Sequence, residues 1–370
     1  MKFEVDRDTF CSALARAAGV VSKDTAMPML RNVLLTAEVD QPVELSATDL
    51  EISLRTRTQA IVHEGGRIAA PAREMLAVVR GLWEDRVMIE LSGENQSMIK
   101  ITAGKSKRKL ACMAAEDFPM IDSVHEMEFG GCDKAELLRA VSRTLFVIPS
   151  ESTGFNIPGA LLHRHESGYY RLVGSDGHRL SYCGIPDTGL PGLEVGAGVV
   201  VPRKGLQECT KLLEASGDAF VACDGTRIVF KTDGGTLSVR LLDPSFPSYG
   251  EIIPEERPFS FSIDAQRLNN TLASMMPLLP GATRMVGFHI TPGTLTLRSA
   301  TNPEGDAEDQ LEIQYDSDEF SIYFNAKYWI EALKAIDGRV RIEWLDKFHG
   351  AILLDEGDAH GLNLIMPMVA

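Results

Sequence analysis

The sequence lacks any long apolar run and any paired-cysteine motif. No stretch approaches the roughly 20 apolar residues of a membrane-spanning helix, and the opening MKFEVDRDTF has no apolar signal core. We therefore expect a cytoplasmic protein that does not enter a membrane. The six cysteines are scattered without a C-x-x-C pair, which predicts reduced core or surface thiols rather than disulfides or a zinc site.

Catalytic signatures are also missing. The AGKS segment at 103–106 is not a phosphate-binding loop, because Ile99 stands where that pattern needs a glycine. Asp176 and His178 have no companion ligands at metal spacing, and there is no G-x-S-x-G elbow. We predict no catalytic residue, no metal and no cofactor. An acidic enzyme with an unrecognised site is kept as an alternative.

The charge balance gives little sign of a nucleic-acid partner. The chain carries 52 acidic and 37 basic residues, for a net charge of −15. A protein that neutralises phosphates usually shows a basic footprint. The placement of the basic residues therefore matters more than their sum.

One unit occurs three times along the chain. A strand-then-helix pattern opens at Phe3, Glu128 and Phe261, with apolar residues at three- and four-residue steps. A second such pattern opens at 67, 199 and 322, and a Thr/Ser-Asp/Asn turn falls at 48, 175 and 301, with spacings of 127 and 126 residues. The pattern predicts an α+β protein of three tandem, structurally equivalent domains. Each domain has two helices and about eight short strands, over residues 1–125, 126–255 and 256–370.

Basic residues are concentrated on the predicted helices. These helices are expected at 8–19, 72–81, 133–146, 203–214, 264–276 and 326–336. They hold twelve Lys/Arg and eight acids, so they carry +4 and the rest of the chain −19, given the total of −15. Such a layer suits a surface that follows a phosphate backbone without reading bases. Ordinary helix surfaces rich in Lys and Arg explain the bias equally well.

Two charge runs of opposite sign stand at similar places in the first and third repeats. The basic run spans 105–109 and the acidic run spans 304–309. Both are explained by solvated hairpin tips. Alternatively, repeat one of one chain pairs with repeat three of another, a head-to-tail contact that closes into a ring.

Nine short segments occur in order along the whole chain: MPMLRNVLL (27–35), TDLE (48–51), PAR (71–73), AAEDFP (114–119), SDGHRL (175–180), VPRKG (201–205), FPSY (246–249), FNAKY (324–328) and the terminal MPM (366–368). Together they resemble the bacterial sliding clamp family, the beta subunits of DNA polymerase III.

The resemblance implies the DNA-clamp fold and a processivity factor, a non-catalytic head-to-tail homodimer whose ring encircles double-stranded DNA without sequence specificity. The DNA-facing residues it implies are Lys23, Arg73, Arg80, Lys134, Arg139, Arg143, Arg203, Lys204, Lys211, Lys327 and Lys334. The dimer interface it implies comprises Lys105, Lys107, Arg108, Lys109, Met276, Leu278, Glu304, Asp306, Glu308 and Asp309. Arg108 and Pro277 depart from the family pattern there.

The resemblance also implies a groove for short apolar peptide motifs. Its partners would be the polymerase III alpha subunit, the clamp loader, other polymerases and repair proteins. The groove residues would be Ile157, Ser175, Gly177, His178, Arg179, Leu180, Pro247, Asn325, Tyr328, Phe348, Leu364, Ile365, Met366, Pro367 and Met368. Without the resemblance, the terminal MPM is explained by an ordinary final strand. Glu251 and the Val369-Ala370 end depart from the family pattern and leave peptide preference open. A protein scaffold that binds no nucleic acid is the second alternative.

Overall fold

The computed structural model describes residues 1–23, 25–92, 97–121, 127–152, 156–243, 245–279, 281, 284–300 and 305–368. Within these residues it has six α-helices, and each lies within three residues of its predicted bounds. They are α1 (Arg7–Val20), α2 (Ala72–Arg80), α3 (Lys134–Thr144), α4 (Arg203–Leu213), α5 (Ala265–Met275) and α6 (Ala326–Leu333). In the described part of the chain, no helix is both long and apolar enough to span a membrane.

Polar side chains fix where three of these helices begin. The Asp6 carboxylate accepts a hydrogen bond from the Thr9 backbone N–H at 3.0 Å, and Asp264 accepts one from Arg267 at 2.6 Å. Asn325 does the same for Lys327 at 3.0 Å. Each bond satisfies a backbone donor that has no partner within the helix.

Short strands fill each repeat. The first repeat has β1 (Lys2–Asp6), β2 (Asn32–Ala37), β3 (Val43–Thr48), β4 (Ile52–Thr58), β5 (Ala60–Glu64), β6 (Gly66–Pro71), β7 (Arg86–Ser92), β8 (Met98–Ala103) and β9 (Ser106–Ala111). The second has β10 (Gly130–Cys132), β11 (Gly159–Arg164), β12 (Tyr170–Ser175), β13 (Arg179–Ile185), β14 (Val199–Pro202), β15 (Ala219–Cys223), β16 (Arg227–Thr232) and β17 (Gly235–Arg240). The third has β18 (Phe259–Asp264), β19 (Met285–Thr291), β20 (Thr294–Ser299), β21 (Glu308–Glu312), β22 (Phe320–Asn325), β23 (Arg339–Trp344), β24 (Ala351–Asp355) and β25 (Gly361–Ile365).

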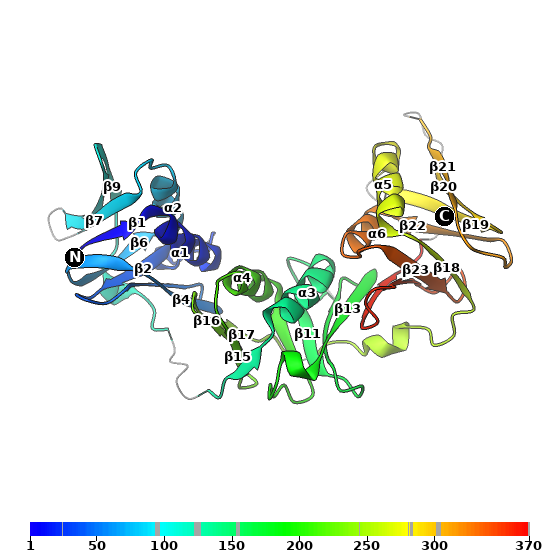
Figure 1. Cartoon of the computed structure of the whole chain (residues 1–370), viewed down its shortest axis with the longest axis horizontal. Helices are drawn as coiled ribbons and strands as arrows, with labels where there is room; N and C mark the ends of the chain where they lie inside the picture. The colour runs from blue at the N-terminus through cyan, green and yellow to red at the C-terminus, as the bar shows by residue number, and fades with distance from the viewer. Residues whose placement is uncertain are drawn as a thin grey trace. The chain divides into compact units, whose positions relative to one another are not determined.

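The chain divides into two compact units, and the division falls inside the second repeat. Unit 1 comprises 1–134, 188–195 and 204–241, and unit 2 comprises 135–187, 196–203 and 242–370. Unit 1 holds the sheets β5-β1-β7-β8-β9 and β10-β15-β16-β17-β4-β3-β2-β6. Unit 2 holds β14-β11-β12-β13-β25-β24-β23-β18 and β21-β20-β19-β22. In Figure 1, β16 and β17 (green) lie beside β4 (blue) in the eight-stranded sheet of unit 1.

Each eight-stranded sheet joins strands of two repeats. In unit 1, β4 of repeat one pairs antiparallel with β17 of repeat two, with Ser53 opposite Ser238. In unit 2, β13 of repeat two pairs antiparallel with β25 of repeat three, with Leu180 opposite Leu364. We call these pairings the first junction and the second junction. They are equivalent, because β4 and β13 each follow the Thr/Ser-Asp turn, and β17 and β25 each end their repeat.

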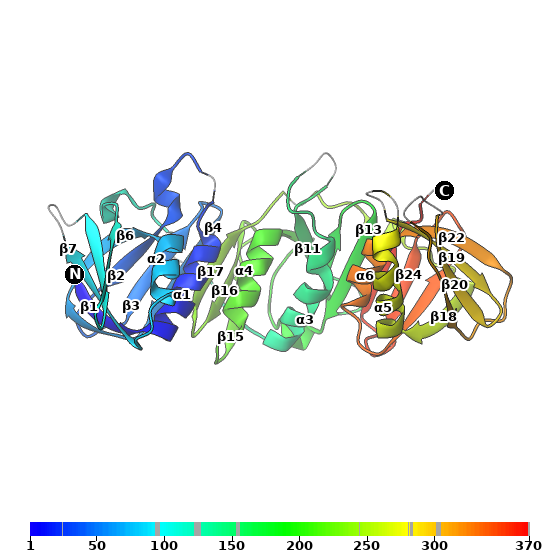
Figure 2. The same ribbon diagram turned by 90° about the horizontal axis from the view of Figure 1, so that it is seen from above.

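Helices cover the sheets on one side within each unit. In unit 1, α1 packs beside α2 and over β3 and β4, and in unit 2, α5 packs beside α6 (Figure 2). The core of unit 2 is aromatic: the Phe288 and Trp329 ring centroids lie 4.5 Å apart, and Trp329 is fully buried. Such rings contribute a large part of the apolar burial that stabilises the fold.

Candidate functional site

The turn that precedes the second junction is fixed by its own side chains. The Asp176 carboxylate accepts hydrogen bonds from the backbone N–H groups of His178 and Arg179, each at 3.0 Å. Ser175 Oγ donates to the Arg179 carbonyl at 2.9 Å. This Asx turn holds the DGHR segment in one conformation at the start of β13.

Arg179 ties this turn to helix α6. The buried guanidinium donates to Asp176 Oδ2 at 2.9 Å, to Glu331 Oε2 at 2.6 Å and to the Phe146 carbonyl at 3.0 Å. Its Cζ lies 4.3 Å from the Tyr328 ring centroid. The Tyr328 ring stacks in turn on His178, at 6.4 Å between centroids. The predicted groove residues from β13 and α6 are therefore brought together.

The C-terminal segment lies beside this turn. The Met366 backbone N–H donates to the His178 carbonyl at 2.9 Å, and the Met368 N–H donates to the Tyr323 carbonyl at 2.7 Å. The regular strand β25 ends at Ile365, so MPM is an irregular extension rather than a strand. Met366 remains 37% exposed and Phe348 71% exposed, which leaves two large apolar side chains accessible to a ligand.

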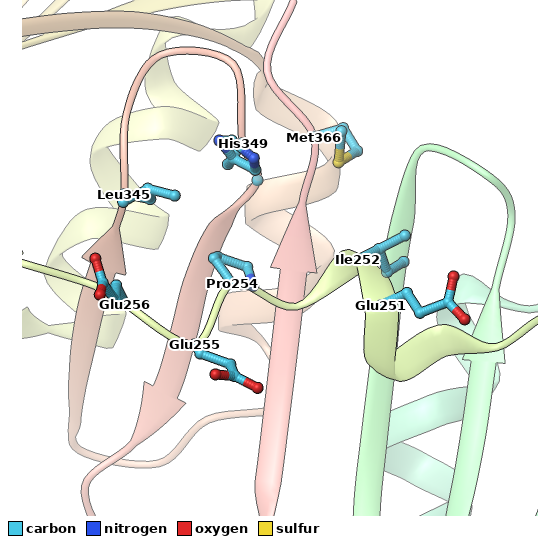
Figure 3. A pocket seen from close by; sticks show the side chains of 9 residues that line it. Glu251, Ile252, Pro254, Glu255, Glu256, Leu345, His349 and Met366 are labelled. Carbon is cyan, nitrogen blue, oxygen red and sulfur yellow. The ribbon is translucent and has the colours of Figure 1, made fainter.

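A pocket of about 590 Å³ opens next to Met366 (Figure 3). Its walls come from the segment that includes the short 3-10 helix Tyr249–Ile252 and from the loop between β23 and β24. The lining residues are Glu251, Ile252, Pro254, Glu255, Glu256, Leu345, His349, Gly350 and Met366. We call this the glutamate-lined pocket. Figure 3 shows Leu345 and His349 on the loop between β23 and β24, and Glu251, Glu255 and Glu256 on the segment that carries Pro254.

Met366 is the predicted groove residue that lines this pocket. Pro247 is exposed and Ile157 is half-buried, and Leu180, Leu364 and Ile365 are buried in the sheet. Sequence reasoning singled out Glu251 as a departure but missed Glu255, Glu256, Leu345 and His349. The EIIPEE segment was a signal for the acids, since it places three carboxylates within six residues.

Several predicted DNA-facing residues have partners inside the protein. Arg139 pairs with Glu136 at 2.6 Å and with Asp358, and Arg143 pairs with Asp355 at 2.5 Å and with Asp358 at 2.9 Å. Because these carboxylates lie next to the guanidinium groups, they offset part of the positive charge that the helices present.

Three more of the predicted basic residues donate to backbone carbonyls. Lys204 contacts the Val20 carbonyl at 2.6 Å and Asp49 at 2.5 Å, and Lys134 contacts the Gly217 carbonyl at 3.0 Å. Arg203 donates to the Leu145 carbonyl at 2.5 Å and to the Ile148 carbonyl. By contrast, the exposed members are Lys23, Arg73, Arg80, Lys211, Lys327 and Lys334. Of these, Lys211 pairs with Glu208 at 2.7 Å, Lys327 pairs with Glu331 at 3.8 Å, and Arg73 donates to the Ala18 carbonyl at 3.5 Å.

The two charge runs lie mainly on strands rather than at hairpin tips. Lys107, Arg108 and Lys109 are exposed on β9, whereas Lys105 is in the turn before it. Glu308 and Asp309 are exposed on β21. Glu304 lies outside the described residues. Met276 and Leu278, in the short 3-10 helix that follows α5, are half-buried, and Pro277 marks the end of that α-helix.

The cysteines are not poised for chemistry. All six are free, and burial raises the pKa of Cys112 and Cys183 to about 11 and that of Cys132 to about 12. The thiol rather than the nucleophilic thiolate is therefore the form present at neutral pH. Among the described residues, no group of three or more His, Cys, Asp and Glu side chains is arranged to hold a metal.

Comparison with known proteins identifies the class to which this three-repeat chain belongs. Models of the N-terminal, central and C-terminal domains of the DNA polymerase III beta subunit match residues 1–122, 132–248 and 250–369. The beta sliding clamps of Caulobacter vibrioides and Pseudomonas aeruginosa are each 29% identical to this chain, with full coverage of both sequences.

Solved structures agree with this match. The fold superposes on Caulobacter crescentus pol III beta with a TM-score of 0.88 at 28% identity, covering 100% of both chains. It superposes with a TM-score of 0.87 on the Pseudomonas aeruginosa clamp bound to griselimycin, again at 28% identity and with complete coverage of both chains. The chain therefore belongs to the DNA polymerase III beta subunit family, the bacterial sliding clamps.

Proposed function

We propose that two copies of this chain close head to tail into a ring that encircles duplex DNA and tethers DNA polymerases to it. The observation that carries this proposal is the order of strands at the sheet edges. Within each copy, the strand after the turn of one repeat pairs with the last strand of the next repeat, twice in succession. A third pairing of the same kind requires a second copy.

The two strands left for that third pairing are β21 and β9. β21 corresponds to β4 and β13, and β9 corresponds to β17 and β25. Each lies at the end of its sheet within the described part of the chain. β9 carries Lys107, Arg108 and Lys109, whereas β21 carries Glu308 and Asp309. Exposed edges of opposite charge avoid pairing with themselves and favour pairing with each other. We infer that this contact closes the ring.

Weak contact with DNA suits this function. The exposed basic residues, such as Arg73 and Lys334, would meet phosphates without reading bases. Because the ring holds DNA by enclosing it, few strong phosphate contacts are needed. The internal pairs of Arg139 and Arg143 limit their share of that contact. No catalytic step is required, and we place the protein in the cytoplasm. We also propose domain boundaries near 125 and 255, which the units alone do not define.

The glutamate-lined pocket and the exposed Met366 and Phe348 side chains would receive the partner peptides. Apolar side chains, methionine above all, adapt to several ligands. The carboxylates of Glu251, Glu255 and Glu256 favour peptides that add a basic residue to the apolar motif. The polymerase III alpha subunit, the clamp loader, other polymerases and repair proteins are the partners we expect.

The test is retention on circular DNA. The protein is loaded on nicked plasmid with a clamp loader and ATP, separated from free protein, and the plasmid is then cut with a single-site nuclease. We expect retention on circles and loss from the cut ends. Equal retention on circular and cut DNA, decreasing with salt alone, would show ordinary electrostatic binding and refute the ring.

A further inference from the structure

The first junction carries a second pocket, of about 410 Å³, within unit 1. Its lining residues come from the turn before β4, from the end of the segment that follows β9, and from β16 and β17. They are Leu50, Glu51, Ser53, Ile121, Thr226, Arg227, Ser238 and Arg240. We call this the arginine-lined pocket. The proposed clamp function does not use it.

This pocket occupies the place in unit 1 that the peptide-facing turn occupies in unit 2. The Asp49 carboxylate accepts hydrogen bonds from the backbone N–H groups of Glu51 and Ile52, two and three residues later, at 3.0 and 2.7 Å. The Asp176 carboxylate accepts the equivalent two bonds from His178 and Arg179. The Arg240 N–H donates to the Glu51 carbonyl at 2.8 Å, just as Met366 donates to His178. Arg240 and Met366 therefore stand at equivalent positions of equivalent junctions.

Two arginines are cross-strand neighbours in the sheet that lines this pocket. Arg227 and Arg240 are directly opposite on β16 and β17. Like charges at opposite positions destabilise a strand pair. Arg227 Nε donates to Asp224 Oδ2 at 3.0 Å, whereas the exposed Arg240 guanidinium has no ion pair within the described residues. A carboxylate bound between the two would relieve the repulsion and receive charge-assisted hydrogen bonds.

The same pocket offers an apolar contact. Leu50 is 55% exposed and holds a left-handed backbone, with φ of 80°, where the second repeat has Gly177 with φ of 83°. That conformation is uncommon for a residue other than glycine, and it turns a large apolar side chain to the surface. Ile121 adds to the apolar lining. The Glu51 carboxylate, also in the lining, offsets part of the positive charge of the two arginines, so the pocket favours a ligand with a single acidic group over a polyanion such as nucleic acid.

We propose that the first junction is a second peptide-docking site, selective for segments in which an acidic residue adjoins a bulky apolar one. The carboxylate binds at Arg240 and the apolar side chain contacts Leu50. This selectivity is opposite in charge to that of the glutamate-lined pocket. The site lies within one copy, so it does not depend on ring closure.

An array of synthetic decapeptides tests the proposal. One half carries Asp or Glu beside Leu, Ile, Phe or Met, and the other half has Asn or Gln in place of each acid. We expect full-length protein to retain peptides of the acidic half, and Arg240→Glu to weaken their binding by about tenfold or more, as the loss of a charge-assisted contact requires. Arg67→Glu, the same charge change on β6 of the same sheet, should leave this binding unchanged, as should Met366→Ala.

Three results would overturn the proposal. The first is equal retention of the acidic and amide halves. The second is acidic-peptide binding that Arg240→Glu does not alter. The third is displacement of bound peptide by a labelled DNA oligonucleotide that itself loses affinity in Arg240→Glu, which would assign the pocket to nucleic acid. Thermal melting of each variant confirms that the exposed substitution leaves the fold intact.

Discussion

The two junctions share a backbone pattern and differ in the side chains that line the pockets beside them. At the first junction Ser53 lies opposite Ser238, and the adjoining pocket carries Arg227 and Arg240. At the second junction Leu180 lies opposite Leu364, and the adjoining pocket carries glutamates. Both junctions combine main-chain pairing with buried apolar side chains, Leu54 and Leu237 at the first and Leu180 and Leu364 at the second, so the residues that line each pocket determine what it can bind.

The largest difference in unfolding free energy between the two junctions is expected when one side chain of the central cross-strand pair is truncated. Leu364 is 1% exposed, so Leu364→Ala should cost about 2–5 kcal/mol of unfolding free energy, through lost burial and a cavity. The equivalent Ser238→Ala should change it by about 0.5 kcal/mol or less. Urea unfolding of both variants measures the contrast. Similar costs would show that the two junctions are stabilised in the same way.

A smaller difference is expected between two arginines in matching turns. Arg179 and Arg227 each donate from Nε to the aspartate three residues earlier, at 2.9 and 3.0 Å. Arg179 also binds Glu331 and is 8% exposed at its side chain, against 27% for Arg227. Removing a buried partner leaves a charge unpaired, so Arg179→Ala should cost about 2–3 kcal/mol and Arg227→Ala about 1 kcal/mol. Chemical denaturation measures both, and an equal cost would contradict the role given to the deeper burial of Arg179.

Charge reversal at the glutamate-lined pocket should change affinity rather than stability. In the double variant Glu251→Lys/Glu256→Lys, peptides with a basic residue beside the apolar motif should bind about 3–10 times more weakly at low salt. Purely apolar peptides should bind as before. Fluorescence polarisation at two salt concentrations measures this. Equal weakening of both peptide types would indicate damage to the groove instead of lost charge complementarity.

The smallest expected effect is a change in how stability depends on pH, and it arises from His163 in unit 2. Burial lowers the pKa of His163, whose ring also contacts the Tyr249 hydroxyl at 2.9 Å, below the ordinary 6.5. As pH falls below 6.5, the unfolded chain takes up a proton that the folded protein does not, so stability falls with pH. His163→Asn should reduce this loss between pH 7.5 and 5.5 in urea unfolding. If the substitution leaves the pH dependence of the unfolding free energy unchanged, His163 does not cause the loss of stability.

Local features of this fold could be predicted from the sequence, and long-range pairing could not. Helix positions followed from apolar residues at three- and four-residue steps, and each repeat has the eight or nine short strands expected of it. Nothing local in the second repeat indicates that β15–β17 and β11–β13 belong to different sheets. That division depends on pairing with β4 and β25, which are far away in the chain.

The same limit applies to the candidate site. The family resemblance led to Arg179, Tyr328 and Met366, which the structure does bring together. The partners of Arg143 could not be foreseen, since Asp355 lies 212 residues away. The acid lining of the pocket beside Met366 likewise requires the β23–β24 loop to meet the segment around Glu255.

The claim that a third junction forms between copies is tested most directly by reversing the charges on β9 and on β21 and measuring dimer formation. One variant carries Lys107→Glu/Lys109→Glu on β9, and the other carries Glu308→Lys/Asp309→Lys on β21. Each alone opposes like charges, so sedimentation should show monomers, whereas an equimolar mixture restores opposite charges at both contacts and should form dimers. Dimers of either variant alone, or monomers in the mixture with both variants folded, would contradict closure through β9 and β21.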